Sequence, residues 1–228
     1  MLSRLLAIMI MAIVDASWDD ASWDAASTPQ YRFASPRNLS FVRILFSDSS
    51  FGYRDPTAPV FDGRWWHVWA TQVKGTEGGY GGVVWHLYSE TLDAAWKDGG
   101  IAVNRSGVGA WDSYGVFTPS VAWEGNAGAV VAAPLATRWF LFFGGVSHPQ
   151  GGTYDEKLGI ARASSPFGPW EKQPDNPIIT GHVPWCDPDG PGKSPGVLHV
   201  DEAEPYVLNG QRRLYVKTVC RNHTVLYV

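Results

Sequence analysis

Three segments of the sequence repeat one pattern, in which a proline is followed by a short apolar run, a glycine turn and a second apolar run. Asp55-Pro56 leads through TAPVFDG to RWWHVW, Thr118-Pro119 through SVAWEG and an insertion to RWFLFF, and Glu204-Pro205 through YVLNG to RRLYVK. The Asp-Gly pair at 62–63 and the Asn-Gly pair at 209–210 are typical of β-hairpin turns, because these residues tolerate positive φ. The repeat therefore predicts similar antiparallel units along the chain.

Further strands are predicted inside the first two units. Residues 81–90 and 94–103 continue the first unit, and residues 157–165 and 166–179 continue the second. No segment of ten residues after the N-terminal region shows sustained helical periodicity. We therefore predict an all-β fold, a β-propeller with about two and a half four-stranded blades. A β-sandwich whose hairpins are alike by chance is the alternative.

Composition and charge limit the classes of function that this chain can have. Of the 228 residues, 45% are hydrophobic and 18% are charged, which is typical of a globular protein. The net charge of -4 gives no basic surface for nucleic acid, so no nucleic-acid partner is expected. No Cys/His cluster has zinc spacing, and the Gly-rich stretch at 75–82 lies between predicted strands rather than before a helix. We expect no metal and no other cofactor.

The N-terminal residues are typical of a secreted protein. Arg4 precedes an apolar run at 5–14 that is too short to span a bilayer, which predicts a signal peptide over 1–16, a flexible leader over 17–40 and one domain over 41–228. A membrane anchor or a buried helix is the alternative for this run. Three N-x-S/T sequons fit secretion and glycosylation, at Asn38, Asn104 and Asn222. After signal cleavage no membrane contact is expected.

The two cysteines, Cys186 and Cys220, leave three arrangements open. In a secreted chain they can form a disulfide within the chain. They can also stay as thiols or pair with another chain.

Four segments resemble the five-bladed β-propeller glycosidases of glycoside hydrolase families 43 and 117. They are RDPTAPVFDGRWWHVWAT (54–71), WDSYGVFTPSV (111–121), LGIARASSPFGPW (158–170) and AEPYVLNGQRRLYVKT (203–218). Two positions depart from those families: Glu204 stands where Asp is usual, and Ser120 follows Pro119 where family 43 usually has an acid. The resemblance implies five blades, so we expect this chain to be C-terminally truncated.

The resemblance also implies a set of site residues. Glycoside hydrolysis uses two carboxyl groups, and the inner strands of a propeller converge on one channel. Asp55 is then the general base, kept ionised by Arg54, and Glu204 is an acid that adjusts the pKa of a partner or orients the substrate. Substrate contacts are expected from Arg54 together with Trp66, Trp111 and Asp112. The alternatives are a turn-capping role for Asp55, an exposed Glu204, a loop position for Asp112 and packing for the tryptophans.

The functional prediction is a secreted glycoside hydrolase that acts on poly- or oligosaccharides, with its general acid on blades beyond this sequence. A carbohydrate is the expected partner. Two alternatives remain: a non-catalytic carbohydrate-binding propeller, and an inactive truncated fragment whose last blade has an open edge.

Overall fold

The computed structural model describes residues 50–74, 80–123, 138–149, 156–180, 197–208, 211–220 and 223–227. These residues form strands, turns and bends, with no helix among them. None of the described residues therefore forms a helix that is long and apolar enough to cross a membrane. The predictions for 1–16, 17–40, Cys186, Asn38 and Asn222 fall outside the described residues.

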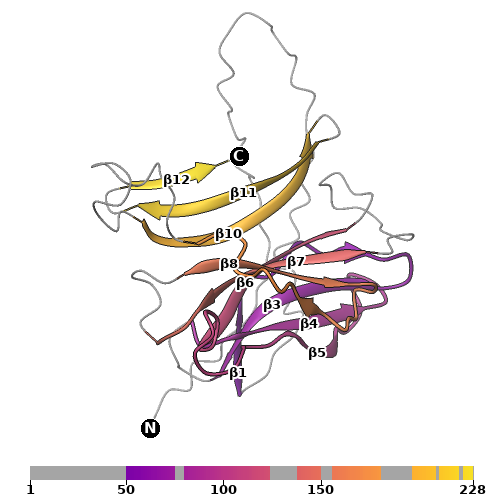
Figure 1. Cartoon of the computed structure of the whole chain (residues 1–228). Helices are drawn as coiled ribbons and strands as arrows, with labels where there is room; N and C mark the ends of the chain where they lie inside the picture. The colour runs from indigo at the N-terminus through magenta and orange to yellow at the C-terminus, as the bar shows by residue number, and fades with distance from the viewer. Residues whose placement is uncertain are drawn as a thin grey trace, which may run out of the picture.

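The strands form three antiparallel sheets in chain order, stacked one on another (Figure 1). The first sheet contains β1 (Phe51–Arg54), β2 (Val60–Phe61), β3 (Trp66–Lys74), β4 (Val83–Ser89) and β5 (Lys97–Val103). The second contains β6 (Gly115–Trp123), β7 (Trp139–Val146), β8 (Lys157–Ala163) and β9 (Glu171–Lys172). The third contains β10 (Val197–Leu208), β11 (Gln211–Cys220) and β12 (His223–Tyr227). Three consecutive meanders of this kind are propeller blades, which confirms the predicted fold class.

The inner strand of each sheet begins earlier than the sequence predicts. The proline repeat in the sequence places Asp55, Thr118 and Glu204 at the starts of these strands. Instead, β6 begins at Gly115 and β10 at Val197, so Thr118 and Glu204 lie inside strands. In the first sheet β1 and β2 both pair with β3, and Asp55 lies directly after β1, in the break between them.

The first two sheets are held together by an apolar cluster. Side chains of neighbouring residues on β3 point to opposite faces, so Trp69 faces the second sheet while Val68 and Ala70 face the other side. The buried members of the cluster are Val60, Trp69, Val84 and Val103 from the first sheet and Val116, Trp123, Trp139, Leu141, Phe143 and Ala161 from the second. This packing fixes the two inner strands, β1–β2 and β6, relative to each other.

A smaller cluster joins the second and third sheets. Leu158 of β8 packs with Val200, Ala203 and Val216 of the third sheet. Phe142, Ile179 and Leu214 pack against its margin. The face of β11 that carries Leu214 and Val216 is therefore the face turned toward the second sheet.

Two buried histidines in the first sheet lie in contact with the second. Nδ1 of His67 and Nε2 of His86 are 2.9 Å apart, and Nε2 of His67 lies 3.1 Å from a carboxylate oxygen of Asp62. Phe167, in the turn after β8, packs edge-on against both imidazole rings. One of these two facing nitrogens can carry a proton and donate it to the other, which accepts it. Both imidazole rings can therefore stay uncharged.

Burial lowers the pKa of His86 from 6.5 to about 3, and the nearby His67 adds to this shift. Burial also lowers the pKa of His67, although the Asp62 carboxylate offsets part of that effect. The unfolded chain takes up protons on these rings near pH 6.5, whereas the folded chain does not. The stability they contribute is therefore complete above about pH 6.5 and is lost as the pH falls toward about 3.

We predict that protonation of His86 in the unfolded chain lowers the free energy of unfolding by about 1.4 kcal/mol for each pH unit below about 6.5. Urea unfolding between about pH 7.5 and about pH 4.5 measures this slope. His86→Gln should make the slope shallower, because the titrating ring is gone. An unchanged slope in His86→Gln would contradict this account.

Candidate functional site

Among the residues that the structure describes, three other than glycine have a left-handed backbone, and each interrupts an inner strand. The φ angles are 51° at Asp55, 44° at Thr118 and 45° at Glu202. Asp55 separates β1 from β2, and the β6–β7 and β10–β11 pairings shift register at Thr118 and at Glu202. Such a backbone costs about 1–3 kcal/mol at a residue with a side chain. The three sheets therefore carry the same irregularity at corresponding places.

This irregularity corrects the alignment of the third unit. The sequence matched Asp55 and Thr118 with Glu204, because each of the three precedes a proline. The structure gives the left-handed backbone to Glu202, which precedes Ala203, and leaves Glu204 two residues farther along β10, opposite Tyr215. The counterpart of Asp55 in the third sheet is thus Glu202, which the proline pattern could not reveal.

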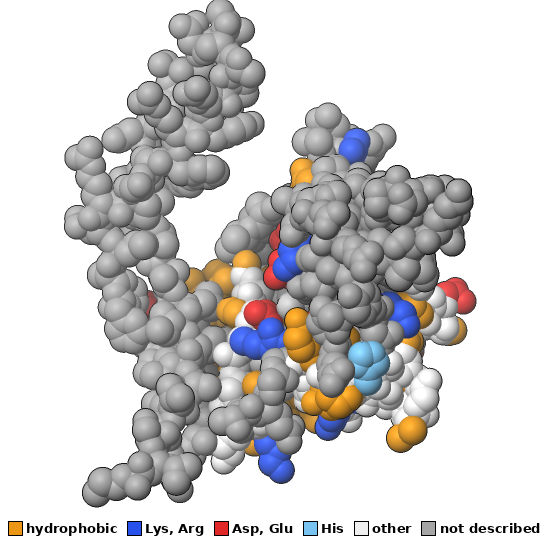
Figure 2. Space-filling model, turned by 90° about the vertical axis from the view of Figure 1, so that its left-hand side faces the viewer, with side chains coloured by type: hydrophobic (Ala, Val, Ile, Leu, Met, Phe, Trp, Pro, Cys, Tyr) orange, Lys and Arg blue, Asp and Glu red, His pale blue; other side chains and the backbone are white. Residues whose placement is uncertain are grey.

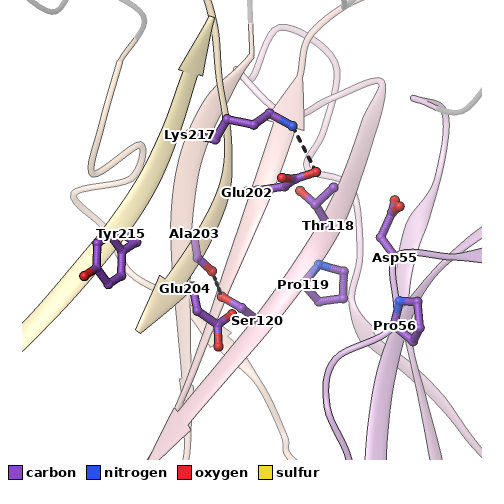
Figure 3. A pocket seen from close by; sticks show the side chains of 10 residues that line it. All are labelled: Asp55, Pro56, Thr118, Pro119, Ser120, Glu202, Ala203, Glu204, Tyr215 and Lys217. Atoms are coloured by element: carbon purple, nitrogen blue, oxygen red, sulfur yellow. Dashed lines mark hydrogen bonds and ion pairs between the residues drawn. The ribbon is translucent and has the colours of Figure 1, made fainter. Parts of the chain in front are cut away.

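The three irregularities open into one cavity of about 350 Å³ (Figure 3). The first sheet contributes Asp55 and Pro56, the second Thr118, Pro119 and Ser120, and the third Glu202, Ala203, Glu204, Tyr215 and Lys217. Asp55 and Tyr215 are 160 positions apart in the chain and line the same cavity. The three units therefore converge on one place.

Asp55 is held by contacts from two neighbours. A carboxylate oxygen of Asp55 lies 2.9 Å from Nη1 of Arg54, and the Thr71 hydroxyl donates to the same oxygen at 3.4 Å. The Thr71 hydroxyl also accepts the backbone N–H of Thr118 at 2.9 Å. Because Thr71 is fully buried on β3, it fixes the irregular segments of the first and second sheets to each other.

The third sheet supplies two carboxyl groups in different environments. Lys217 Nζ lies 2.9 Å from the Glu202 carboxylate, so Glu202 is ion-paired. Partial burial raises the pKa of Glu204, even though much of its side chain is exposed. The Ser120 hydroxyl donates to the Ala203 carbonyl oxygen and ties the second sheet to the third. Neighbouring carboxyl groups with such different surroundings can hold different protonation states in one site.

Other predicted site residues lie outside the cavity lining. Trp66 packs on Phe61, five residues before Thr71 on β3 and thus about 17 Å from it along the strand. The Trp111 ring is stacked on Phe143 and leaves no room for a Cβ atom at Gly145 or Gly159.

Asp112 is fully buried and contacts Lys172, which also donates to the Ser106 hydroxyl at 2.9 Å. This ion pair joins the outer strand β9 to the segment before β6. Trp66, Trp111 and Asp112 therefore have packing partners in the blades, and the cavity does not include them.

The site is mixed in charge. On the face seen in Figure 2, acidic and basic side chains lie beside one another among apolar ones. In the part of the chain that the structure describes, no group of three His, Cys, Asp or Glu residues is arranged to hold a metal ion. The residues that line the cavity offer carboxyl, hydroxyl, aromatic and ammonium groups.

Comparison with known proteins finds a relative in sequence and several structures with a similar fold. No known protein-family profile matches the sequence. A β-xylosidase of Bacillus subtilis (strain 168) is 26% identical over 197 residues, which cover 68% of this chain and 35% of that enzyme.

Solved structures agree on the fold. An endo-1,4-β-xylanase from Bacteroides thetaiotaomicron has a TM-score of 0.51 at 13% identity, covering 81% of this chain and 55% of that one. A fructofuranosidase from Schwanniomyces occidentalis has a TM-score of 0.52 at 15% identity, covering 79% and 35%. The predicted resemblance to propeller glycosidases is confirmed. The chain spans about a third of the length of the β-xylosidase and just over half of the xylanase.

We predict that Thr71→Val lowers the free energy of unfolding by about 1–3 kcal/mol, because the buried Thr118 N–H loses its acceptor. Thr71→Ser keeps the hydroxyl and should lose less stability. Its loss should not exceed the contribution of the one methyl group that is removed. Urea unfolding of both variants measures the difference. Equal stability of the Val variant and the wild type would show that Thr71 does not hold the two sheets together.

Proposed function

We propose that this chain, which resembles the propeller glycosidases in sequence and fold, hydrolyses glycosidic bonds at the cavity lined by Asp55, Glu202 and Glu204. The observation that supports this most is the convergence of three carboxyl groups, from two sheets, on one cavity. Hydrolysis of a glycosidic bond uses one carboxyl group as an acid and a second as a base or nucleophile.

The surroundings of the carboxyl groups suggest their roles. Asp55 is ion-paired with Arg54, and an ionised carboxylate is the form that accepts a proton from attacking water. Glu204 has a raised pKa, so it keeps its proton to a higher pH than an ordinary glutamate and can donate to a sugar oxygen. This proposal gives Glu204 the role of general acid, which the family resemblance assigns to a carboxyl group on further blades. Glu202, paired with Lys217, adds negative charge beside them that stabilises an oxocarbenium-like transition state.

The charges favour a neutral sugar. Arg54 and Lys217 each contact a carboxylate of the site. A uronate or sulfated sugar would have to compete with Asp55 and Glu202 for these two cations. We therefore propose neutral poly- or oligosaccharides as substrates, and, with residues 1–16 as a signal peptide, a secreted protein that meets them outside the cell.

A non-catalytic carbohydrate-binding propeller is the second candidate. The observation that favours it is the contribution of the second sheet, whose residues at the cavity are Thr118, Pro119 and Ser120 and include no carboxyl group. Under this alternative the cavity binds sugar through the same residues, but Asp55 activates no water.

We predict that Asp55→Asn lowers the rate of hydrolysis by about 100- to 10,000-fold, because the base is removed. The fold should persist, since Asn is isosteric and tolerates the left-handed backbone at this position. The assay uses 4-nitrophenyl β-xyloside, α-arabinofuranoside and β-galactoside, with 4-nitrophenyl β-glucuronide as the acidic comparison.

Asp175→Asn is the matched control, because Asp175 is exposed in a turn outside the cavity, and it should keep full activity. Sugar binding without any hydrolysis by the unmodified chain would favour the non-catalytic alternative. Turnover that survives in Asp55→Asn would remove Asp55 from the mechanism.

A further inference from the structure

The cavity contains one aromatic side chain, and it comes from a strand that sequence analysis did not assign to the site. Tyr215 lies on β11 and is the aromatic member of the ten residues that line the cavity. It remains 37% exposed, whereas Trp69 and Trp139 of the blades are buried. A large aromatic group left open inside a polar cavity is a typical ligand-contacting feature.

A second tyrosine supports this ring. The centroids of Tyr206 and Tyr215 are 4.2 Å apart, and the ring planes differ by 18°, so the two rings are stacked. In the β10–β11 register Tyr206 is paired with Arg213 and Tyr215 with Glu204, which places the two tyrosines diagonally on one face of the sheet. The stack restrains Tyr215 before any ligand arrives, and this lowers the entropic cost of binding.

The two sets of side chains that alternate along β11 differ in chemistry. Leu214 and Val216 pack in the apolar cluster with Leu158 of the second sheet, whereas Tyr215 and Lys217 line the cavity. Apolar clusters join the first sheet to the second and the second sheet to the third. The face with Tyr215 instead alternates aromatic and charged residues, with Glu204 and Lys217 as further lining of the cavity.

Figure 3 shows Tyr215 and Asp55 on opposite sides of the group of labelled residues, with Thr118, Pro119 and Glu204 between them. We propose that Tyr215, backed by Tyr206, is the platform on which the apolar C–H face of a sugar ring stacks in this cavity. The electron-rich face of an aromatic ring attracts such C–H groups. The inference rests on the proposed function in that it takes a carbohydrate as the ligand of the cavity.

The platform is tested by the binding of xylotriose and of arabinotriose to the full chain, measured by calorimetry and by saturation-transfer NMR. The Asp55→Asn background prevents turnover during the measurement. Tyr215→Leu should weaken binding about tenfold, because it keeps apolar volume but removes the ring. Tyr215→Phe keeps the ring and should bind as the parent does, and Tyr206→Leu should weaken binding by a smaller factor.

Phe167→Leu serves as the control, because Phe167 is 45% exposed but lies outside the cavity, and it should leave binding unchanged. Urea unfolding of each variant shows that the fold is retained. Unchanged affinity in Tyr215→Leu, or no binding of either sugar to the parent, overturns the platform. Binding that depends on Tyr215 without any hydrolysis by the unmodified chain keeps the platform and overturns the proposed hydrolysis.

Discussion

The left-handed backbone at Asp55, Thr118 and Glu202 is the constraint on which the site depends. In a regular strand these side chains would alternate between the two faces of a blade, where apolar neighbours would leave a carboxylate without water. The interruption of each inner strand turns the residue toward the cavity instead. The strain of about 1–3 kcal/mol per residue is offset by bonds around each break. After Asp55, Thr57 restores the pairing, since its N–H donates to the Trp69 carbonyl at 2.8 Å and its hydroxyl accepts the Trp69 N–H at 3.1 Å.

Packing between the sheets holds the residues that line the cavity in fixed positions. The apolar clusters between the first and second and between the second and third sheets fix the three stacked sheets relative to one another (Figure 1). Short polar links then set the finer geometry at the cavity: Thr71 joins Asp55 to Thr118, and Ser120 joins the second sheet to the third. Sites supported by such contacts are preorganised, so less binding energy is spent on ordering them.

Much of the fold could be predicted from the sequence, because hairpin turns and alternating apolar runs are local signals. Gly63 has the positive φ of 101° that the Asp-Gly pair indicated. The site was predictable only in part. Asp55 stood out beside a proline, but Glu202 did not, since the third irregularity has no proline after it. Tyr215 comes from the second strand of its sheet, and only the pairing of β10 with β11 brings it beside Glu204. The packing of Trp111 above two glycines depends on contacts between β7 and β8, which no local pattern reveals.

The central claim is that three interrupted strands form one sugar-binding cavity. A crystal structure of the Asp55→Asn variant soaked with xylotriose tests it most directly. We expect a sugar ring in the cavity, with its face against Tyr215 and a hydroxyl within hydrogen-bond distance of Asn at position 55 or of Glu204. Sugar density beside Trp66 or Trp111, with the cavity free of sugar, would contradict the account.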